Sequence, residues 1–206
     1  MSGPSFDPTQ RPIAFGSWEW RAFAARFELP PGLDDPVVER RADEYLVAPG
    51  LPAARGLKLR GGRRLELKLL EGSEGPGGEL QRWSKVFSDQ LPLEPWQGRV
   101  LARLLAPGAP VPVRPLPDRE AVLGFVRALR IGEPRVVVVS KTISGWLLED
   151  GVRLERTLLE LEGDALETLS LDGPSPAALL AARAGLVLPP DARLLSYPAW
   201  VAGRGA

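Results

Sequence analysis

Glycine and proline divide this sequence into short segments, and that division limits what the chain can fold into. The 206 residues include 22 glycines and 22 prolines. Most segments between them alternate polar and apolar residues, a period of two that is typical of β-strands with one buried face. Dipeptides such as Gly61-Gly62 and Asp150-Gly151 favour tight turns between neighbouring strands. The sequence therefore predicts a mainly β protein built from short antiparallel strands.

The predicted strands are numerous enough to suggest that their sheet closes into a barrel. They lie in the segments "AFGSWEWRAFAARF", "ERRADEYLVAP", "GLKLR", "RRLELKLL", "GELQRWSKVFS", "EPRVVVVSKTISGWLL", "EDGVRLERTLLELEG" and "DALETLSLDG". A sheet of this many strands tends to curl or close on itself, and closure removes exposed edges. We expect a closed antiparallel β-barrel of about eight strands with flanking helices, in the mainly β (α+β) class.

Two segments in the middle of the chain have helical rather than strand periodicity. In "EPWQGRVLARLLA" and "DREAVLGFVRALRIG" the apolar residues recur at helical spacing, and Asp118 is a candidate N-cap of the second segment. We expect one domain over residues 13–206, with a helical insertion at about 94–131, after a disordered leader over 1–12.

A third helix is predicted near the C-terminus. "SPAALLAARAGL" has Ser175 as a candidate N-cap and Pro176 in its first turn. The remaining tail is rich in proline, and we expect it to be irregular and held to the domain by Tyr197 and Trp200.

Two residue types are absent, and their absence excludes several kinds of chemistry. The sequence has no cysteine and no histidine, which rules out disulfides, thiolate nucleophiles, His-containing triads and Cys- or His-ligated zinc. A metal would need oxygen ligands, which favour magnesium, manganese or calcium. A general base would have to be a carboxylate, a lysine or a tyrosine.

The charge balance and the N-terminus bear on partners and location. The 26 Lys and Arg residues equal the 26 Asp and Glu residues, so the net charge gives no reason to expect nucleic-acid binding. No apolar run approaches the roughly 20 residues that cross a bilayer, and the polar N-terminus lacks a secretory core. We expect a cytoplasmic protein, monomeric or homodimeric, that binds no membrane.

Many predicted strands carry charged residues on one face. The residues that share such faces are Glu19 with Arg21, Lys58 with Arg60, Arg64 with Glu66 and Lys68, Lys85 with Trp83 and Phe87, Lys141 with Val137, Val139 and Ile143, and Glu155 with Thr157. Alternation alone leaves open whether these faces meet solvent or the barrel interior. If they point inward, Lys and Arg would bind a multiply charged anion such as a phosphorylated small molecule, and carboxylates would hold a divalent metal.

The order of these motifs resembles the CYTH family, the triphosphate tunnel metalloenzymes. The family's first-strand pattern E-x-E-x-K is matched by Ser17-Trp18-Glu19-Trp20-Arg21, with a serine in place of the first acid. Further matches are the "ADEYL" strand, the Lys58-Leu59-Arg60 pattern, "LELK" ending at Lys68, the strand that contains Lys141, and "LETLSLDG" ending at Asp172-Gly173. The resemblance spans about residues 15–188.

The resemblance implies an eight-stranded barrel whose tunnel binds triphosphate compounds together with magnesium or manganese. It implies a metal-dependent triphosphatase in which charged residues hold the phosphates and the metal. The candidates are Glu19, Arg21, Lys58, Arg60 and Lys68 for catalysis; Arg64, Lys85 and Lys141 for substrate; and Glu19, Glu155, Glu160 and Asp172 for metal. On a regular strand Glu160 faces away from Glu155.

Two alternatives remain at this stage. Because Ser17 replaces an acid, the chain could be a non-catalytic barrel of the same kind that binds a phosphorylated ligand or a protein partner. The six tryptophans would also suit an unrelated barrel with an apolar lumen that carries lipid-like or pigment-like ligands.

Overall fold

The computed structural model describes residues 17–109 and 114–203, so the predicted leader lies outside the described residues. The strands are β1 Ser17–Ala24, β2 Val37–Val47, β3 Arg55–Arg60, β4 Arg64–Glu74, β5 Leu80–Gln90, β6 Arg135–Leu147, β7 Arg153–Leu161, β8 Asp164–Gly173 and the short β9 Arg193–Leu194. The α-helices are α1 Pro95–Leu105, α2 Arg119–Ala128, α3 Pro176–Ala184 and α4 Tyr197–Ala202.

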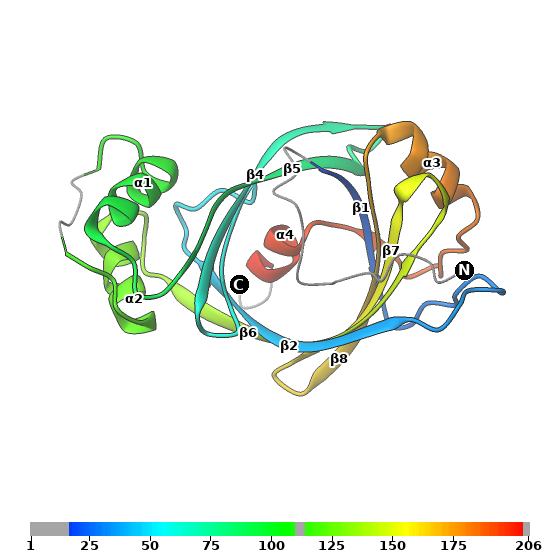
Figure 1. The fold of residues 1–206 in the computed structure, drawn as a ribbon, viewed down its shortest axis with the longest axis horizontal. Helices are drawn as coiled ribbons and strands as arrows, with labels where there is room; N and C mark the ends of the chain where they lie inside the picture. The colour runs from blue at the N-terminus through cyan, green and yellow to red at the C-terminus, as the bar shows by residue number, and fades with distance from the viewer. Residues whose placement is uncertain (1–16, 110–113, 204–206) are drawn as a thin grey trace, which may run out of the picture.

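Eight of these strands form a closed antiparallel barrel (Figure 1). The order around the barrel is β5-β4-β3-β2-β6-β7-β8-β1, and the pairing of β1 with β5 closes it. The ninth strand, β9, adds only a short pairing to β1. The predicted fold class is therefore confirmed: a mainly β protein built on a closed barrel with flanking helices.

The tight turns predicted from glycine are present where the chain reverses. Gly61 and Gly62 both have positive φ, 57° and 67°, in the β3–β4 hairpin. Asp150 and Gly151 also have positive φ, between β6 and β7. Because glycine pays no Cβ penalty in this region, it can reverse the chain in very few residues. The resulting hairpins keep neighbouring strands in register.

The apolar faces of β3, β4 and β5 point outward and are covered by the helical hairpin of α1 and α2 (Figure 1). Leu57, Leu59, Leu65 and Leu67 are at most 1% exposed and pack in one cluster with residues of both helices. Asp118 caps α2, because its side chain accepts a hydrogen bond from the Ala121 backbone N–H at 2.9 Å. The leucines that alternate with the cations thus form the outer core, and the cations face the lumen.

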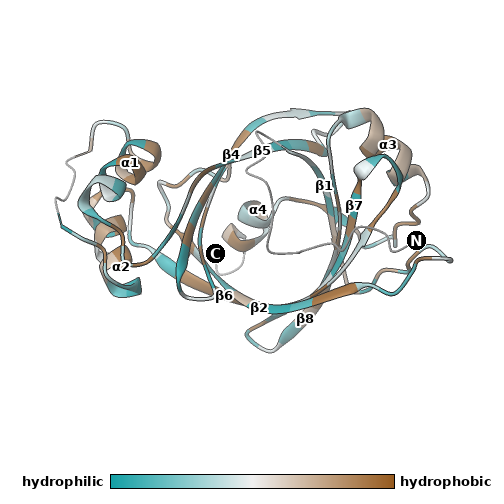
Figure 2. Cartoon of the chain, viewed as in Figure 1, coloured by the Kyte–Doolittle hydropathy of each residue, from teal (hydrophilic) through white to brown (hydrophobic). Residues whose placement is uncertain are grey.

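A second outer core lies under α3. Trp20 on β1 is 1% exposed and packs with Leu169 and Leu171 of β8 and with Leu179 of α3. The helix begins where the sequence predicts, because Ser175 accepts a hydrogen bond from the Ala178 backbone N–H. Figure 2 shows hydrophilic and hydrophobic segments alternating along the barrel strands. The tryptophans of β1 therefore belong to the outside of the barrel, as expected if the charged faces point inward.

None of the helices in the described ranges has both the length and the apolar character needed to span a membrane.

The C-terminal tail is not irregular, contrary to the expectation from its prolines. It contains β9 and the helix α4, whose N-cap Ser196 accepts a hydrogen bond from the Ala199 backbone N–H. Figure 1 shows α4 within the ring of strands. Trp200 and Val201 are buried there, and this tertiary burial stabilises a helix too short for periodicity to reveal.

A bulge in β5 corrects one predicted face. Leu67 pairs with Phe87, but the next residue, Lys68, pairs with Lys85, so Val86 is an extra residue in the strand. Because one extra residue shifts side-chain alternation, Lys85 and Phe87 lie on opposite faces. Phe87 belongs to the outer core, whereas Lys85 contacts Glu66 inside the barrel.

Candidate anion-binding site in the barrel lumen

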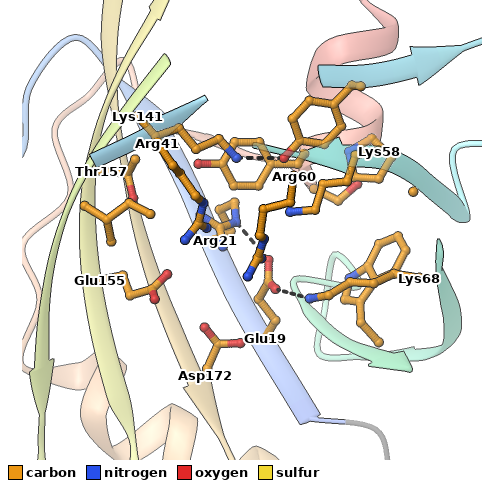
Figure 3. A pocket seen from close by; sticks show the side chains of 17 residues that line it. Glu19, Arg21, Arg41, Lys58, Arg60, Lys68, Lys141, Glu155, Thr157 and Asp172 are labelled. Atoms are coloured by element: carbon orange, nitrogen blue, oxygen red, sulfur yellow. Dashed lines mark hydrogen bonds and ion pairs between the residues drawn. The ribbon is translucent and has the colours of Figure 1, made fainter. Parts of the chain in front are cut away.

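The barrel encloses a cavity lined mainly by charged side chains (Figure 3). Its charged lining residues are Glu19, Arg21, Arg41, Lys58, Arg60, Lys68, Lys141, Glu155 and Asp172, so six cations face three acids. When their ion-pair partners Glu39, Asp43, Glu66 and Arg153 are counted, together with Lys85, which pairs with Glu66, cations still outnumber acids by eight to six. In a chain of zero net charge, this lumen concentrates positive charge.

Asp43 is the acid at the centre of the cation cluster. Its side chain is fully buried, and its Oδ2 lies 3.0 Å from Lys58 Nζ and 2.8 Å from Lys141 Nζ. Arg41 Nε lies 3.5 Å from Oδ1. Burial alone would raise the pKa of Asp43, but the three cations outweigh burial and hold its pKa far below the ordinary value. Asp43 is therefore a permanent anion that holds the cations in place.

Lys141 is fully committed to protein partners. Its ammonium donates hydrogen bonds to Asp43 Oδ2 and to the Tyr45 hydroxyl, both at 2.8 Å. It also lies over the ring of Tyr197, 4.0 Å from the centroid. Burial lowers the pKa of Lys141 to about 8, although Asp43 opposes the change. In this structure the Lys141 ammonium contacts Asp43, Tyr45 and Tyr197 together.

Glu66 anchors a second group of cations on the β3–β5 side. Its side chain is fully buried and lies 3.7 Å from Lys58 Nζ, 3.4 Å from an Arg60 nitrogen and 3.4 Å from Lys85 Nζ. Burial would raise the pKa of Glu66, but these cations lower it. Burial also lowers the pKa of Lys58 well below its ordinary value, with Asp43 opposing. The cations on this side therefore share two buried acids, Asp43 and Glu66.

The first-strand motif places Glu19 and Arg21 side by side in the lumen. Arg21 Nε donates to Glu19 Oε1 at 2.8 Å, and another guanidinium nitrogen donates to the Thr168 hydroxyl. Burial opposes the charge of Arg21, but Glu19 raises its pKa above the ordinary value. Lys68 Nζ lies 4.0 Å from Glu19 Oε2 (Figure 3). Glu19 thus acts in this structure as the partner of two cations.

The acids of the lumen do not fit a metal held by protein ligands alone. Glu155 pairs with Arg153 at 2.7 Å, Glu19 pairs with Arg21, and Asp172 lies opposite Glu19 in the β1–β8 register. The described residues bring no three carboxylates close enough together to hold a metal ion. The guanidinium groups of Arg21 and Arg153 lie beside two of these carboxylates, Glu19 and Glu155.

Most of the candidate site residues meet in this one cavity. Glu19, Arg21, Lys58, Arg60, Lys68, Lys141, Glu155 and Asp172 all line it. Lys85 is one step removed, paired with Glu66. Arg64 is exposed at the start of β4 and does not line the cavity.

Glu160 lies apart from the other metal candidates. The register of β7 with β6 and β8 is continuous, so no bulge turns Glu160 inward. Its side chain is exposed on the outer face of the barrel, opposite to Glu155. Strand parity separates these two acids, as the alternation in the sequence indicated.

Sequence reasoning missed Arg41 and Tyr197 as lining residues. Arg41 lines the cavity and pairs with Glu39 and Asp43. The sequence contained the information needed to find Arg41, because Glu39, Arg41, Asp43 and Tyr45 occupy every second position of β2 and so share one face of the strand. Tyr197 comes from α4, and the position of that helix inside the barrel depends on long-range packing that no local pattern encodes.

Along the strands, the inward faces change from charged to apolar. In the charged half of the lumen, defined by the cavity-lining charges and Asp43, the inward residues include Arg21, Asp43 and Thr157. Two positions further along the same faces lie Phe23, Tyr45 and Leu159. The apolar half consists of Phe23, Tyr45, Val137, Val139, Leu159, Leu161, Trp200 and Val201. This charged lining excludes the alternative of an apolar ligand tunnel through the barrel.

Comparisons with known proteins add limited information. No protein-family model matches the chain, and no curated protein matches it. Among solved structures, a protein from Hippeastrum assigned as an adenylyl cyclase, and described as having a dominant triphosphatase activity, aligns with a TM-score of 0.45 and 13% identity over 82% of this chain and 85% of that chain. A protein from Bacillus halodurans assigned as an adenylate cyclase aligns with a TM-score of 0.39 and 14% identity over 70% of each chain.

Proposed function

We propose that this protein binds a linear triphosphate, free or as part of an organic triphosphate, in the charged half of its barrel lumen. The observation that carries the proposal is the cavity lining itself, in which six cations face three acids inside a closed barrel. Lys and Arg are the side chains that recognise phosphate oxygens. A surrounding wall of cations suits a compact anion of high charge better than a flat or singly charged ligand.

The cations differ in their availability to a ligand. Lys68 and Arg60 keep side-chain exposures of 25% and 22%. Lys141, at 2% exposure, is enclosed by its own partners. We assign Lys68, Arg60 and Lys58 as the main phosphate contacts, with Arg41 and Arg21 contributing guanidinium donors. Asp43 and Glu66 hold these cations at fixed positions.

Hydrolysis of the bound triphosphate is a second candidate function. It is favoured by the retained Glu19-Trp20-Arg21 motif and by the three carboxylates in the lining. The resemblance to triphosphate tunnel enzymes would assign magnesium or manganese to Glu19, Glu155 and Asp172. Because Glu19 and Glu155 are held in ion pairs and the described residues bring no three carboxylates together as metal ligands, we derive no catalytic step from them and propose binding as the primary function.

Isothermal titration calorimetry with tripolyphosphate tests the proposal. We expect saturable binding to the wild-type protein, weakened by about tenfold to a hundredfold in Lys68→Met, since a hydrogen bond to a charged group contributes about 1.5–3 kcal/mol. Arg64→Met is the matched control, because Arg64 lies on the same strand but outside the cavity. Equal weakening in both variants, or no binding to wild type, would contradict the proposal.

A phosphate-release assay on the same protein separates binding from hydrolysis. Tripolyphosphate and ATP are incubated with magnesium, with manganese and with a chelator. Release that requires metal and disappears in Glu19→Ala would establish the second candidate. Binding without release would leave the barrel as a triphosphate-binding protein.

A further inference from the structure

One end of the lumen is filled by the C-terminal helix. Trp200 of α4 stacks on Phe23 of β1, with ring centroids 5.2 Å apart, and Tyr197 stacks on Tyr45 of β2 at 5.8 Å. Trp200 is 7% exposed and Val201 is fully buried. The aromatic side chains of α4 and the barrel thus form a continuous packed layer across the apolar half.

The fit of α4 against the barrel wall is close. A Cβ at Gly56 on β3 would lie 3.0 Å from Pro198 Cγ, a separation that forces one of the two groups to move. The absence of a side chain at Gly56 therefore allows α4 to approach the wall. Arg135 secures the other end of the helix by donating hydrogen bonds to the carbonyl oxygens of Val201 and Ala202.

Two cations of the lumen hold α4 from the charged side. The Lys141 ammonium lies 4.0 Å from the ring centroid of Tyr197, and the guanidinium carbon of Arg21 lies 4.3 Å from it. Cation–π contacts are strongest when the cation is desolvated, as it is here. Tyr197 therefore lies at the boundary between the charged and apolar halves of the lumen. Its ring covers Lys141 and Arg21 on the side that faces α4.

We infer that α4 closes the lumen and makes the site a cup that accepts a polyphosphate by its end and excludes internal segments of a longer chain. This inference rests on the proposed function, because it describes how the same cavity would discriminate among phosphate anions. A ligand can reach the cations where Lys68 and Arg60 remain partly exposed.

The charge of a phosphate chain supports recognition of its end. A terminal phosphate group carries about −1.5 to −2 charges near neutral pH, whereas each internal phosphate, held by two phosphoanhydride bonds, carries about one. Lys58 is buried and lines the same cavity as the partly exposed Lys68 and Arg60, so a terminal group that enters past them would meet it. A closed cavity with excess positive charge therefore matches the end of the chain in both shape and charge.

The test compares linear polyphosphate of one defined length with the same polyphosphate whose two terminal phosphates are capped as alkyl amidates. Calorimetry gives the affinity and the number of protein molecules per chain, and tripolyphosphate is titrated first. We expect no more than one protein molecule per free chain end, and loss of lumen binding to the capped chain. Lys68→Met is titrated in parallel, and binding that this substitution weakens is assigned to the lumen.

The outcomes separate this inference from the proposed function. If tripolyphosphate does not bind, the proposed function fails. If tripolyphosphate binds and the capped chain binds equally well through the lumen, or if more protein molecules bind than there are chain ends, the cup is overturned while the function stands.

A second variant tests α4 itself. A chain that ends at Leu195 lacks α4, and we expect more protein molecules per polyphosphate chain than in wild type, because the far end of the lumen is then open. An unchanged number would show that α4 is not the barrier. The comparison of capped and uncapped chains needs only the wild-type protein, so it remains decisive if this variant does not fold.

Discussion

The two halves of the lumen use the same strand faces for opposite purposes. In the charged half, inward positions of β1, β2, β6 and β7 hold ions that are balanced by buried acids. In the apolar half, the next inward positions on these strands pack against α4. The comparison shows that strand alternation determines which side chains point into the barrel. Whether those inward positions are charged or apolar then determines whether that part of the interior can bind a ligand or is filled by packed side chains.

The largest expected effect comes from the charged half. Asp43→Ala removes the acid shared by Lys58, Lys141 and Arg41 and leaves buried cations without a partner. Removing one member of a buried ion pair costs about 3–5 kcal/mol. We expect a loss of unfolding free energy of that size by urea denaturation. Asp172→Ala, at the partly exposed end, is the control, and an equal loss there would contradict the central role of Asp43.

The next effect is in the apolar half. Trp200→Ala leaves a cavity beside Phe23, and truncation of a buried tryptophan costs about 3 kcal/mol or more. We expect lower stability and faster hydrogen exchange in α4, together with retained tripolyphosphate binding, because Trp200 does not line the charged cavity. Loss of binding at a protein concentration and temperature where the variant is folded would show that the halves are not independent.

A smaller effect concerns pH. Lys141 releases its proton near pH 8 when folded but near its ordinary value of 10.5 when unfolded. Between these values the unfolded chain binds more protons, so stability rises with pH. The lowered pKa of Lys58 acts in the same direction.

Above about pH 10 the buried tyrosines reverse this trend. The pKa values of Tyr45 and Tyr197 are raised by burial, so the unfolded chain loses these protons first and stability falls. Urea denaturation from pH 7 to 11 should show stability that rises above about pH 8 and reaches a maximum near pH 10, with the rise reduced in Lys141→Met. A rise that is unchanged in Lys141→Met would contradict the assignment to this lysine.

The smallest effect is expected outside the barrel. Glu160→Gln changes an exposed side chain on the outer face, and such substitutions usually stay within about 0.5 kcal/mol. We expect unchanged stability and unchanged affinity for tripolyphosphate. A clear loss of affinity in this variant would restore Glu160 as a site residue and would require a rearranged β7.

Much of the barrel could be predicted because its information is local. The alternation along β3 and β4 separates Leu57 and Leu59 from Lys58 and Arg60, and Gly61-Gly62 marks the turn between these strands. The same parity indicated that Glu155 and Glu160 face opposite ways. Once closure is inferred, these local patterns place most of the candidate residues in one lumen.

The remaining features depend on contacts between distant segments. No local pattern indicates that α4 lies inside the barrel or that Tyr197 covers Lys141, because these positions depend on packing across the whole fold. The role of Asp43 could not be ranked from sequence either, since its three cations come from β2, β3 and β6. The sequence thus predicts which strand faces line the lumen better than it predicts the position of α4 inside it or the contacts among the lining side chains.

The extra residue in β5 has a consequence for how this protein can change. Deletion of Val86 would bring the strand back to regular alternation, and on one side of the deletion every side chain would exchange faces. Lys85 and Trp83 would turn toward the outer core, and Ser84 toward the lumen. In this strand the number of residues matters as much as their identity. Deleting one residue, a change that many loops tolerate, would change which side chains of β5 line the cavity, although no remaining amino acid is altered.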